Sequence, residues 1–154
     1  MSSAISEIRR LVYGLRPPAL DEVGLVEALR QQAGRFAEAR HDGGLVVEVN
    51  APGGVHNLPA AIEVAAFRIA AEAINNAARH AHASHCCVRL SAGDALEVEV
   101  VDDGSGWRTG ARAGVGLASM RERAEELGGT LVLSATPGGG SRVLASIPLK
   151  VRQP

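Results

Sequence analysis

Residues 96–106, LEVEVVDDGSG, run from an alternating apolar and acidic stretch directly into a turn rich in aspartate and glycine. Such alternation is typical of a β-strand with one buried face. Residues 86–91 form a second extended stretch, and Ala92-Gly93-Asp94 between the two predicts a hairpin. We therefore expect two antiparallel strands, with the aspartates where the second strand reaches the edge of the sheet.

The rest of the chain alternates helical and extended patterns around this hairpin. Early helices, late antiparallel pairs and few crossovers predict an α+β fold, a two-layer sandwich in which a mixed, mostly antiparallel sheet carries helices on one face. Arg16-Pro17-Pro18 predicts an extended linker. We expect helices over residues 3–14, 21–41, 59–81 and 117–127, and further strands over residues 45–49, 130–135 and 142–147.

Composition excludes several classes of protein. The 154 residues suit one domain, and 16 Lys and Arg against 17 Asp and Glu give a net charge of −1. No basic surplus indicates a nucleic-acid partner, and no charged tail indicates direct contact with a membrane. Cys86 and Cys87 are adjacent and could pair only with strain, so we expect a reducing, cytoplasmic compartment. No apolar run reaches the ~20 residues that a membrane span needs. This observation does not exclude a membrane anchor elsewhere in a longer parent protein.

The predicted long helix carries a polar cluster formed by Glu72, Asn75, Asn76, Arg79 and His80. At about 100° per residue, all but Asn75 fall on one face of the helix. Asparagine is a poor helix former, so two in mid-helix need a reason. A solvated polar face is one explanation. The other is a site, because an amide oxygen suits Mg²⁺, a hard cation.

Two glycine-containing stretches are further candidates. The glycines after Asp102 would let the main chain approach a flat ligand, and Asp102 could accept a hydrogen bond from an exocyclic amine. An ordinary Asp-Gly turn explains the same residues. Gly114 and Gly116 precede a predicted helix start, where free N–H groups favour an anion. The stretch around Gly114 lacks the ending of a P-loop, and the stretch that begins at Asp102 lacks the ligand pattern of an EF-hand.

Taken in chain order, these stretches resemble the N, G1 and G2 boxes of the gyrase, heat-shock chaperone, histidine kinase and MutL (GHKL) ATPases. Residues 15–20 are similar to the junction between dimerisation helices and catalytic domain in sensor kinases of the nitrate- and desaturase-sensor type. Residues 138–141 are similar to the last glycine-rich motif of these kinases, with Ser141 where threonine is usual. The three boxes are Glu72-x-x-x-Asn76, Asp102-x-Gly104-x-Gly106 and Gly114-x-Gly116-Leu117.

The resemblance implies a Bergerat fold, with residues 1–20 as the remnant of a dimerisation helix and linker and residues 21–150 as the catalytic domain. It implies an enzyme, the ATP- and Mg²⁺-binding part of a two-component sensor histidine kinase. The γ-phosphoryl group would pass to a histidine on a dimerisation domain of the parent kinase and from there, indirectly, to a response regulator. No histidine precedes His41, so we expect no autophosphorylation in cis.

The resemblance also assigns roles by position. Glu72 would orient or deprotonate the attacking group, and Asn76 would bind Mg²⁺, which makes these two the catalytic pair. Asp102 would bind the adenine amine, and residues 107–113 would form a lid over the nucleotide. The cofactor-binding positions implied are Asn76, Arg79, His80, Asp102, Gly104, Gly106, Gly114, Gly116, Leu117 and Ser141.

Three alternatives accompany this interpretation. A non-catalytic or anti-sigma-type GHKL module would act by binding a partner. A gyrase or mismatch-repair machine is disfavoured, since no transducer domain follows the final strand. A zinc site is also disfavoured, because adjacent side chains on a strand point to opposite faces. Its candidate ligands are His80, His82, His85, Cys86 and Cys87.

Overall fold

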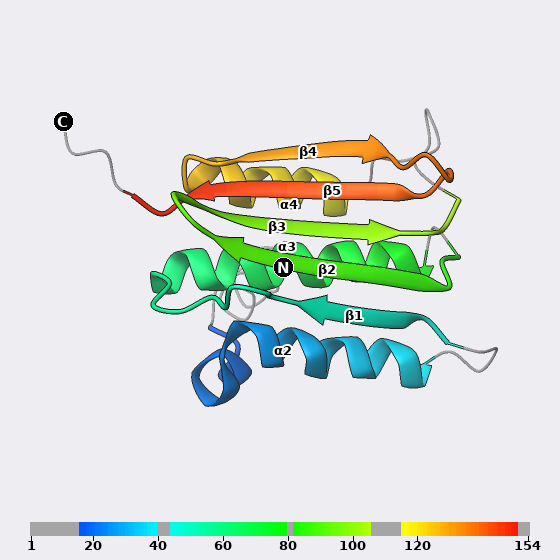
Figure 1. Ribbon diagram of the computed structural model, residues 1–154, viewed down its shortest axis with the longest axis horizontal. Coiled ribbons are helices and arrows are strands. Elements are labelled where there is room, and N and C mark those ends of the chain that lie inside the picture. Colours follow the sequence, from blue (N-terminus) through cyan, green and yellow to red (C-terminus); the bar gives the residue numbers. More distant parts are fainter. Residues whose placement is uncertain (1–15, 40–43, 80–81, 106–114, 151–154) are drawn as a thin grey trace, which may run out of the picture.

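The computed structural model describes residues 16–39, 44–79, 82–105 and 115–150 (Figure 1). The predicted helix over residues 3–14 lies outside these ranges. The helices are α2 (Pro18–Ala39), α3 (Ala60–Arg79) and α4 (Val115–Glu126), and the strands are β1 (Val46–Asn50), β2 (His85–Ala92), β3 (Ala95–Asp102), β4 (Thr130–Ala135) and β5 (Ser141–Pro148).

The strands form one sheet in the order β1-β2-β3-β5-β4, and α3 and α4 cover one of its faces (Figure 1). β1 pairs with β2 in parallel, and the other neighbours are antiparallel. The predicted α+β sandwich with a mixed, mostly antiparallel sheet is confirmed. Both predicted hairpins are present, β2 with β3 and β4 with β5.

The core between sheet and helices is aliphatic, as a chain with few aromatic residues requires. Leu96, Val98 and Val100 of β3 point toward the helices and are almost fully buried. Because side chains alternate along a strand, Asp102 continues this buried row at the end of β3. Alanines on the buried face of α3 let this helix approach the sheet closely, and they include Ala66, Ala70, Ala73 and Ala77.

α2 begins earlier than the sequence indicated. Its first residue is Pro18, so the prediction of an extended linker through Pro18 and a helix start at Asp21 was wrong. Proline fits the first helical position because its missing N–H has no helical acceptor there. Leu20 is already in the core, with 3% of its surface exposed. Gly24, at φ 81° and ψ 174°, then interrupts the helix, a conformation that glycine adopts most readily.

Arg16 joins the start of α2 to the start of α3. Its Nε donates to Asp21 Oδ1 at 2.6 Å, and its guanidinium also pairs with Glu63. α2 itself lies beside β1 and packs against α3 (Figure 1). Arg16, just before α2, is therefore tied to the first turn of α3.

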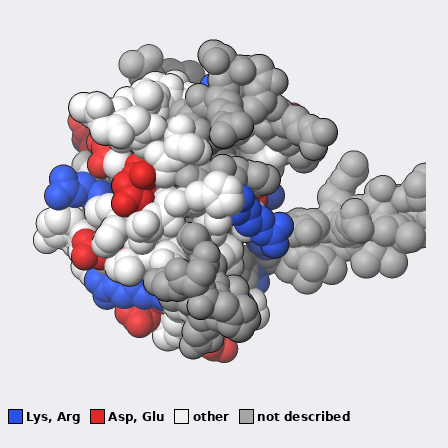
Figure 2. Space-filling model, turned by 90° about the vertical axis from the view of Figure 1, so that its right-hand side faces the viewer, with Lys and Arg blue, Asp and Glu red and all other residues white. Residues whose placement is uncertain are grey.

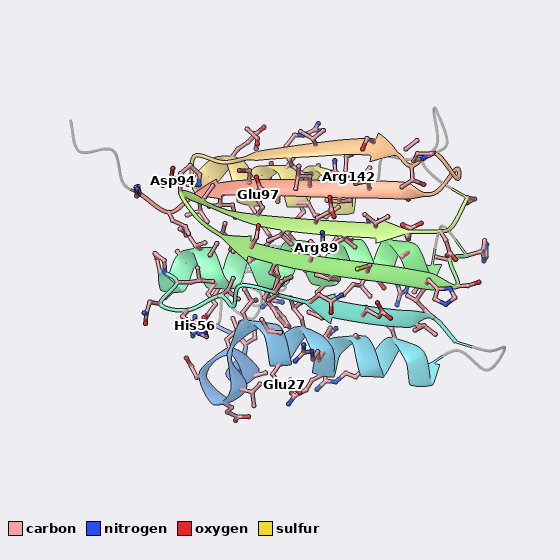
Figure 3. All side chains as sticks on the ribbon, in the orientation of Figure 1. Glu27, His56, Arg89, Asp94, Glu97 and Arg142 are labelled. Atoms are coloured by element: carbon pink, nitrogen blue, oxygen red, sulfur yellow. The ribbon has the colours of Figure 1, made fainter. Side chains whose placement is uncertain are left out.

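The helix-free face of the sheet mixes charged side chains with exposed aliphatic ones, among them Val46 and Val132. Arg89, Glu97 and Arg142 extend from it (Figure 3), and Arg142 Nη2 lies 2.6 Å from Glu99 Oε2. Figure 2 shows one end of the molecule, where acidic and basic side chains of the described residues are interspersed. No helix within the described ranges combines the length and apolarity that a bilayer span requires.

Candidate functional site

Asp102 is a buried carboxylate at the end of β3, with 8% of its surface exposed. Its Oδ2 accepts a hydrogen bond from Ser141 Oγ at 2.9 Å, and its Oδ1 accepts one from Gly104 N–H at 2.9 Å. Ser141 is itself buried at the start of β5. The two contacts orient the carboxylate, and each oxygen keeps a lone pair for a further donor.

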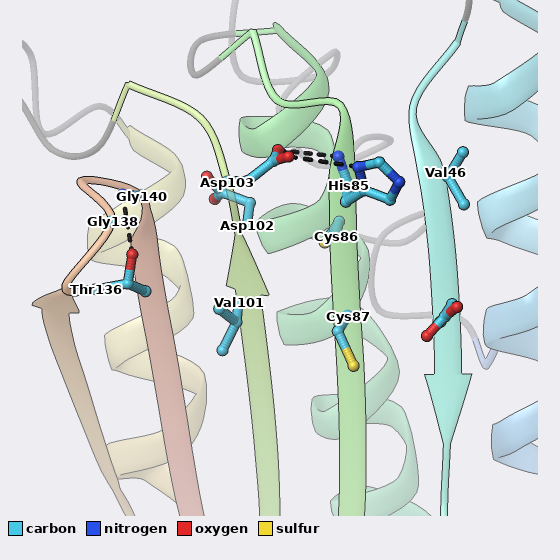
Figure 4. A pocket seen from close by; sticks show the side chains of 11 residues that line it. Val46, His85, Cys86, Cys87, Val101, Asp102, Asp103, Thr136, Gly138 and Gly140 are labelled. Carbon is cyan, nitrogen blue, oxygen red and sulfur yellow. Dashed lines mark hydrogen bonds and ion pairs between the residues drawn. The ribbon is translucent and has the colours of Figure 1, made fainter.

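Gly140 lets the loop before β5 close on this strand end. A Cβ on Gly140 would overlap the carbonyl oxygen of Asp102 and lie 2.9 Å from the carbonyl carbon. Thr136 holds the same loop: its Oγ1 accepts from Gly140 N–H at 2.9 Å, and its own N–H donates to the Gly140 carbonyl at 2.9 Å (Figure 4). Thr136 was not among the residues predicted from the sequence, where its only signal is its place before a Pro-Gly-Gly-Gly turn.

Glu72 on α3 meets Gly116 in the first turn of α4. A Cβ on Gly116 would overlap the Glu72 carboxylate and lie 3.0 Å from Cδ. The first and third sequence motifs are thus in contact, although they are far apart in the chain. A carboxylate beside a helix N-terminus is also electrostatically favoured.

Asn76 and Arg79 occupy the last turns of α3. Asn76 is half-buried, and Arg79 is exposed. The end of α3, the end of β3 and the beginning of α4 lie at the same end of the molecule (Figure 1). Leu117 is half-buried against the core. His80, Gly106 and Gly114 lie outside the described residues.

The cysteines behave as the strand geometry predicted. Cys86 is buried on the helix side, whereas Cys87 is half-buried on the opposite face. Burial, with a smaller contribution from the charge of Asp102, raises the pKa of Cys86 to about 12, so its thiol stays protonated. Within the part of the chain that the structure describes, no three His, Cys, Asp or Glu side chains are grouped to hold a metal ion.

A hollow of about 350 Å³ lies at the same end of the sheet (Figure 4). Its walls include Glu48, Cys87 and Val101, whose side chains lie on the helix-free face. Asp102 and Glu72, in contrast, are on the helix side. The hollow also reaches Asp102, Asp103 and Gly140 at the end of β3, but neither Glu72 nor Gly116 is among the residues that line it.

The mixed sheet, its one-sided helical layer and the three motifs at one end define the two-layer sandwich of histidine-kinase-like ATPases. Residues 61–151, more than half of the chain, match the family described as histidine kinase-, DNA gyrase B-, and HSP90-like ATPase, and the chain belongs to this family. The sequence-based family assignment is confirmed.

Curated relatives are sensor kinases. The chain is 33% identical over 156 residues to the signal transduction histidine-protein kinase/phosphatase DegS of Brevibacillus brevis, covering 99% of this chain and 40% of that protein. It is 35% identical over 160 residues to the sensor histidine kinase MctS of Rhizobium johnstonii, covering 100% of this chain and 34% of that protein. The chain thus spans less than half the length of these relatives.

Solved structures agree with this assignment. The ATP-binding domain of PrrB from Mycobacterium tuberculosis is 28% identical, with a TM-score of 0.61, and the match covers 82% of this chain and 95% of that domain. The present fold therefore corresponds to nearly the whole of a separately crystallised ATP-binding domain.

Proposed function

We propose that this chain is the ATP-binding catalytic domain of a two-component sensor histidine kinase, donating the γ-phosphoryl group of ATP to a histidine on a dimerisation domain of the parent protein. In this proposal the residues before α2 belong to the dimerisation helix and its linker, and the catalytic domain extends from α2 to residue 150. A response regulator receives the phosphoryl group indirectly. The observation that carries the proposal is the oriented, buried carboxylate of Asp102 at the end of the molecule where Glu72 meets Gly116.

The purine end of the site is built around Asp102. An exocyclic amine donates to a carboxylate oxygen, and Ser141 and Gly104 leave lone pairs free for that bond. The site is nearly dry, since Asp102 and Ser141 are both buried, and a charge-assisted hydrogen bond is strong in such surroundings. Gly106 lies beside the base in this proposal.

The phosphate end of the site lies between α3 and α4. Asn76 would supply an amide oxygen to Mg²⁺, and its half-buried position one turn beyond Glu72 fits a hard cation that keeps several waters. Bound Mg²⁺ would neutralise phosphate charge. Arg79 and His80 would face the phosphates in this proposal. The first turn of α4, which includes Gly116 and Leu117, would offer its N–H groups to the phosphates in this proposal, with Gly114 just before it in the chain.

Glu72 orients the group that attacks the γ-phosphorus. Phosphoryl transfer depends mainly on positioning and charge neutralisation, so a carboxylate placed by contact with Gly116 suits this role. The acceptor histidine comes from the dimerisation domain, and the reaction therefore requires the two parts together.

The test combines this chain with a separate dimerisation fragment that carries a phosphoacceptor histidine and with γ-labelled ATP. Label on the fragment, lost with Asn76→Ala and retained with the remote control Asp94→Ala, supports the kinase. A folded chain that binds no ATP in the presence of Mg²⁺ would overturn the proposal. Partner binding that survives Asp102→Ala, without any transfer of label, would instead favour the non-catalytic module.

A further inference from the structure

Asp103 makes an unusual set of contacts for an exposed residue. Its Oδ1 accepts a hydrogen bond from the backbone N–H of His85 at 2.9 Å (Figure 4). The same Oδ1 also accepts one from the backbone N–H of Ser84 at 2.8 Å. Its own N–H donates to the His85 carbonyl at 3.2 Å, and its Oδ2 lies 3.4 Å from His85 Nδ1. One residue thus binds the beginning of β2 through both backbone and side chain.

These contacts extend the pairing of β2 with β3 by one step. The last regular pair is Cys86 with Asp102, and residue 103 would otherwise leave the sheet. Because Asp103 is bonded to His85, the pairing of the two strands continues one residue beyond Asp102, the final residue of β3. The orientation of the Asp102 carboxylate therefore depends on its neighbour in the chain.

Ser84, which Asp103 contacts, belongs to a segment that is also hydrogen-bonded to β1 and to α3. The Ser84 carbonyl accepts from Val46 N–H of β1 at 2.9 Å, and Ala83 N–H donates to the Ala77 carbonyl near the end of α3 at 3.2 Å. Ala83 is completely buried. Asp103 consequently connects the end of β3 to the end of α3, where Asn76 lies.

Asp102 is held from the other side as well. Ser141 Oγ and the close approach of Gly140 fix it toward β5, whereas Asp103 fixes the same strand end toward β2. The backbone N–H groups of His85 and Ser84 also hold the pKa of the Asp103 carboxyl below its ordinary value, so the acceptor is ionised at neutral pH.

We propose that Asp103 is a positioning residue for nucleotide recognition, which holds the Asp102 carboxylate and the end of α3 at a set separation. This inference rests on the proposed function, since it concerns the purine contact of that same site. Asp103 touches no substrate. Its loss should impair recognition of the purine more than it impairs the fold, because water can replace the contacts at the exposed Ser84 and His85 N–H groups.

The experiment measures dissociation constants for ATP and GTP with Mg²⁺ in four proteins: the unaltered chain, Asp103→Ala, Asp103→Asn and the control Asp94→Ala. Asp94 is an exposed carboxylate at the opposite end of the sheet (Figure 3). Asp103→Ala should weaken ATP binding about tenfold and reduce the preference for ATP over GTP. Asp103→Asn should stay within about twofold, because one amide oxygen can accept both N–H groups as Oδ1 does.

Two results would overturn the inference. One is Asp103→Ala with unchanged affinity and unchanged purine preference. The other is an equal loss of ATP and GTP binding that Asp103→Asn does not restore, which indicates a general structural role. If the unaltered chain binds no nucleotide, the proposed function fails, and amide hydrogen exchange then decides the positioning role. In Asp103→Ala, faster exchange of the Gly104 N–H, which donates to Asp102, supports the positioning role. Unchanged exchange of this N–H refutes the positioning role.

Discussion

Asp102→Asn provides the sharpest test of the purine site. In this protein the side chain lies between two donors, Ser141 Oγ and Gly104 N–H, each at 2.9 Å. An asparagine can keep both contacts, because its Oδ1 accepts from Gly104 while its amide N–H donates to the Ser141 hydroxyl oxygen. The substitution changes neither volume nor buried contacts to a large extent, so we expect the fold to be retained.

The nucleotide experiences a different environment. Asparagine replaces a charged acceptor by a neutral amide whose free N–H would face the donor group of the base. Loss of a hydrogen bond to a charged group costs about 1.5–3 kcal/mol. At about 1.4 kcal/mol for each factor of ten, the dissociation constant should rise about ten- to a hundredfold.

The assay is calorimetric titration of ATP with Mg²⁺ at constant salt, accompanied by thermal unfolding of both proteins without nucleotide. Asp94→Asn, a change of the same type at an exposed position, is the control. An ATP affinity equal to that of the unaltered chain, in a protein with the same unfolding midpoint, would refute the assigned contact. A large fall in the thermal unfolding midpoint of Asp102→Asn would contradict the expectation that asparagine keeps both hydrogen bonds.

Three further predictions concern the elements around the site. Gly140→Ala should destabilise the fold by about 1–3 kcal/mol through backbone overlap, whereas Gly138→Ala, whose Cβ has no neighbour within 4 Å, should be near neutral in urea unfolding. The pKa of Asp103 is lower in the folded chain, so its contribution is complete above its unfolded pKa of about 4 and is lost as pH falls toward the folded value. Urea midpoints of the unaltered chain and Asp103→Asn should therefore converge in acid, and a constant difference would contradict this. Alkylation of the native chain near pH 8 should modify Cys87 before Cys86, whose pKa is about 12; mass spectrometry of digests would show the opposite order if the burial argument is wrong.

Sequence periodicity was sufficient for most of the secondary structure and for the fold class. The alternation in residues 96–101 determines which side chains face the helices, because successive residues on a strand point to opposite faces. α4 ends within one residue of the predicted position 127, where the N–H groups of Gly128 and Gly129 bond to the carbonyls of Glu125 at 2.9 Å and Ala124 at 2.8 Å. The motifs were recognisable for the same reason: each is a short local pattern whose residues are close in the chain.

Predictions from local sequence patterns were less reliable where one stretch is compatible with two backbone conformations. The Arg16-Pro17-Pro18 stretch fits an extended linker and equally fits a helix that starts at its last proline. Burial of Leu20 and the ion pairs of Arg16 with Asp21 and Glu63 accompany the helical solution. Glu63 lies in α3, far from residues 16–18 in the sequence, so these three residues alone do not show which of the two conformations is adopted.

By itself the sequence determined the strand and helix periods, the position of Asp102 at the end of a strand and the order of the three motifs. Only the tertiary structure decided that Glu72 meets Gly116, that Gly140 closes on Asp102 and that Asp103 grips Ser84 and His85. The spacing at which apolar side chains repeat along a strand or a helix is a property of each segment alone. Contacts between segments depend on strand register and helix packing, which the whole core sets together.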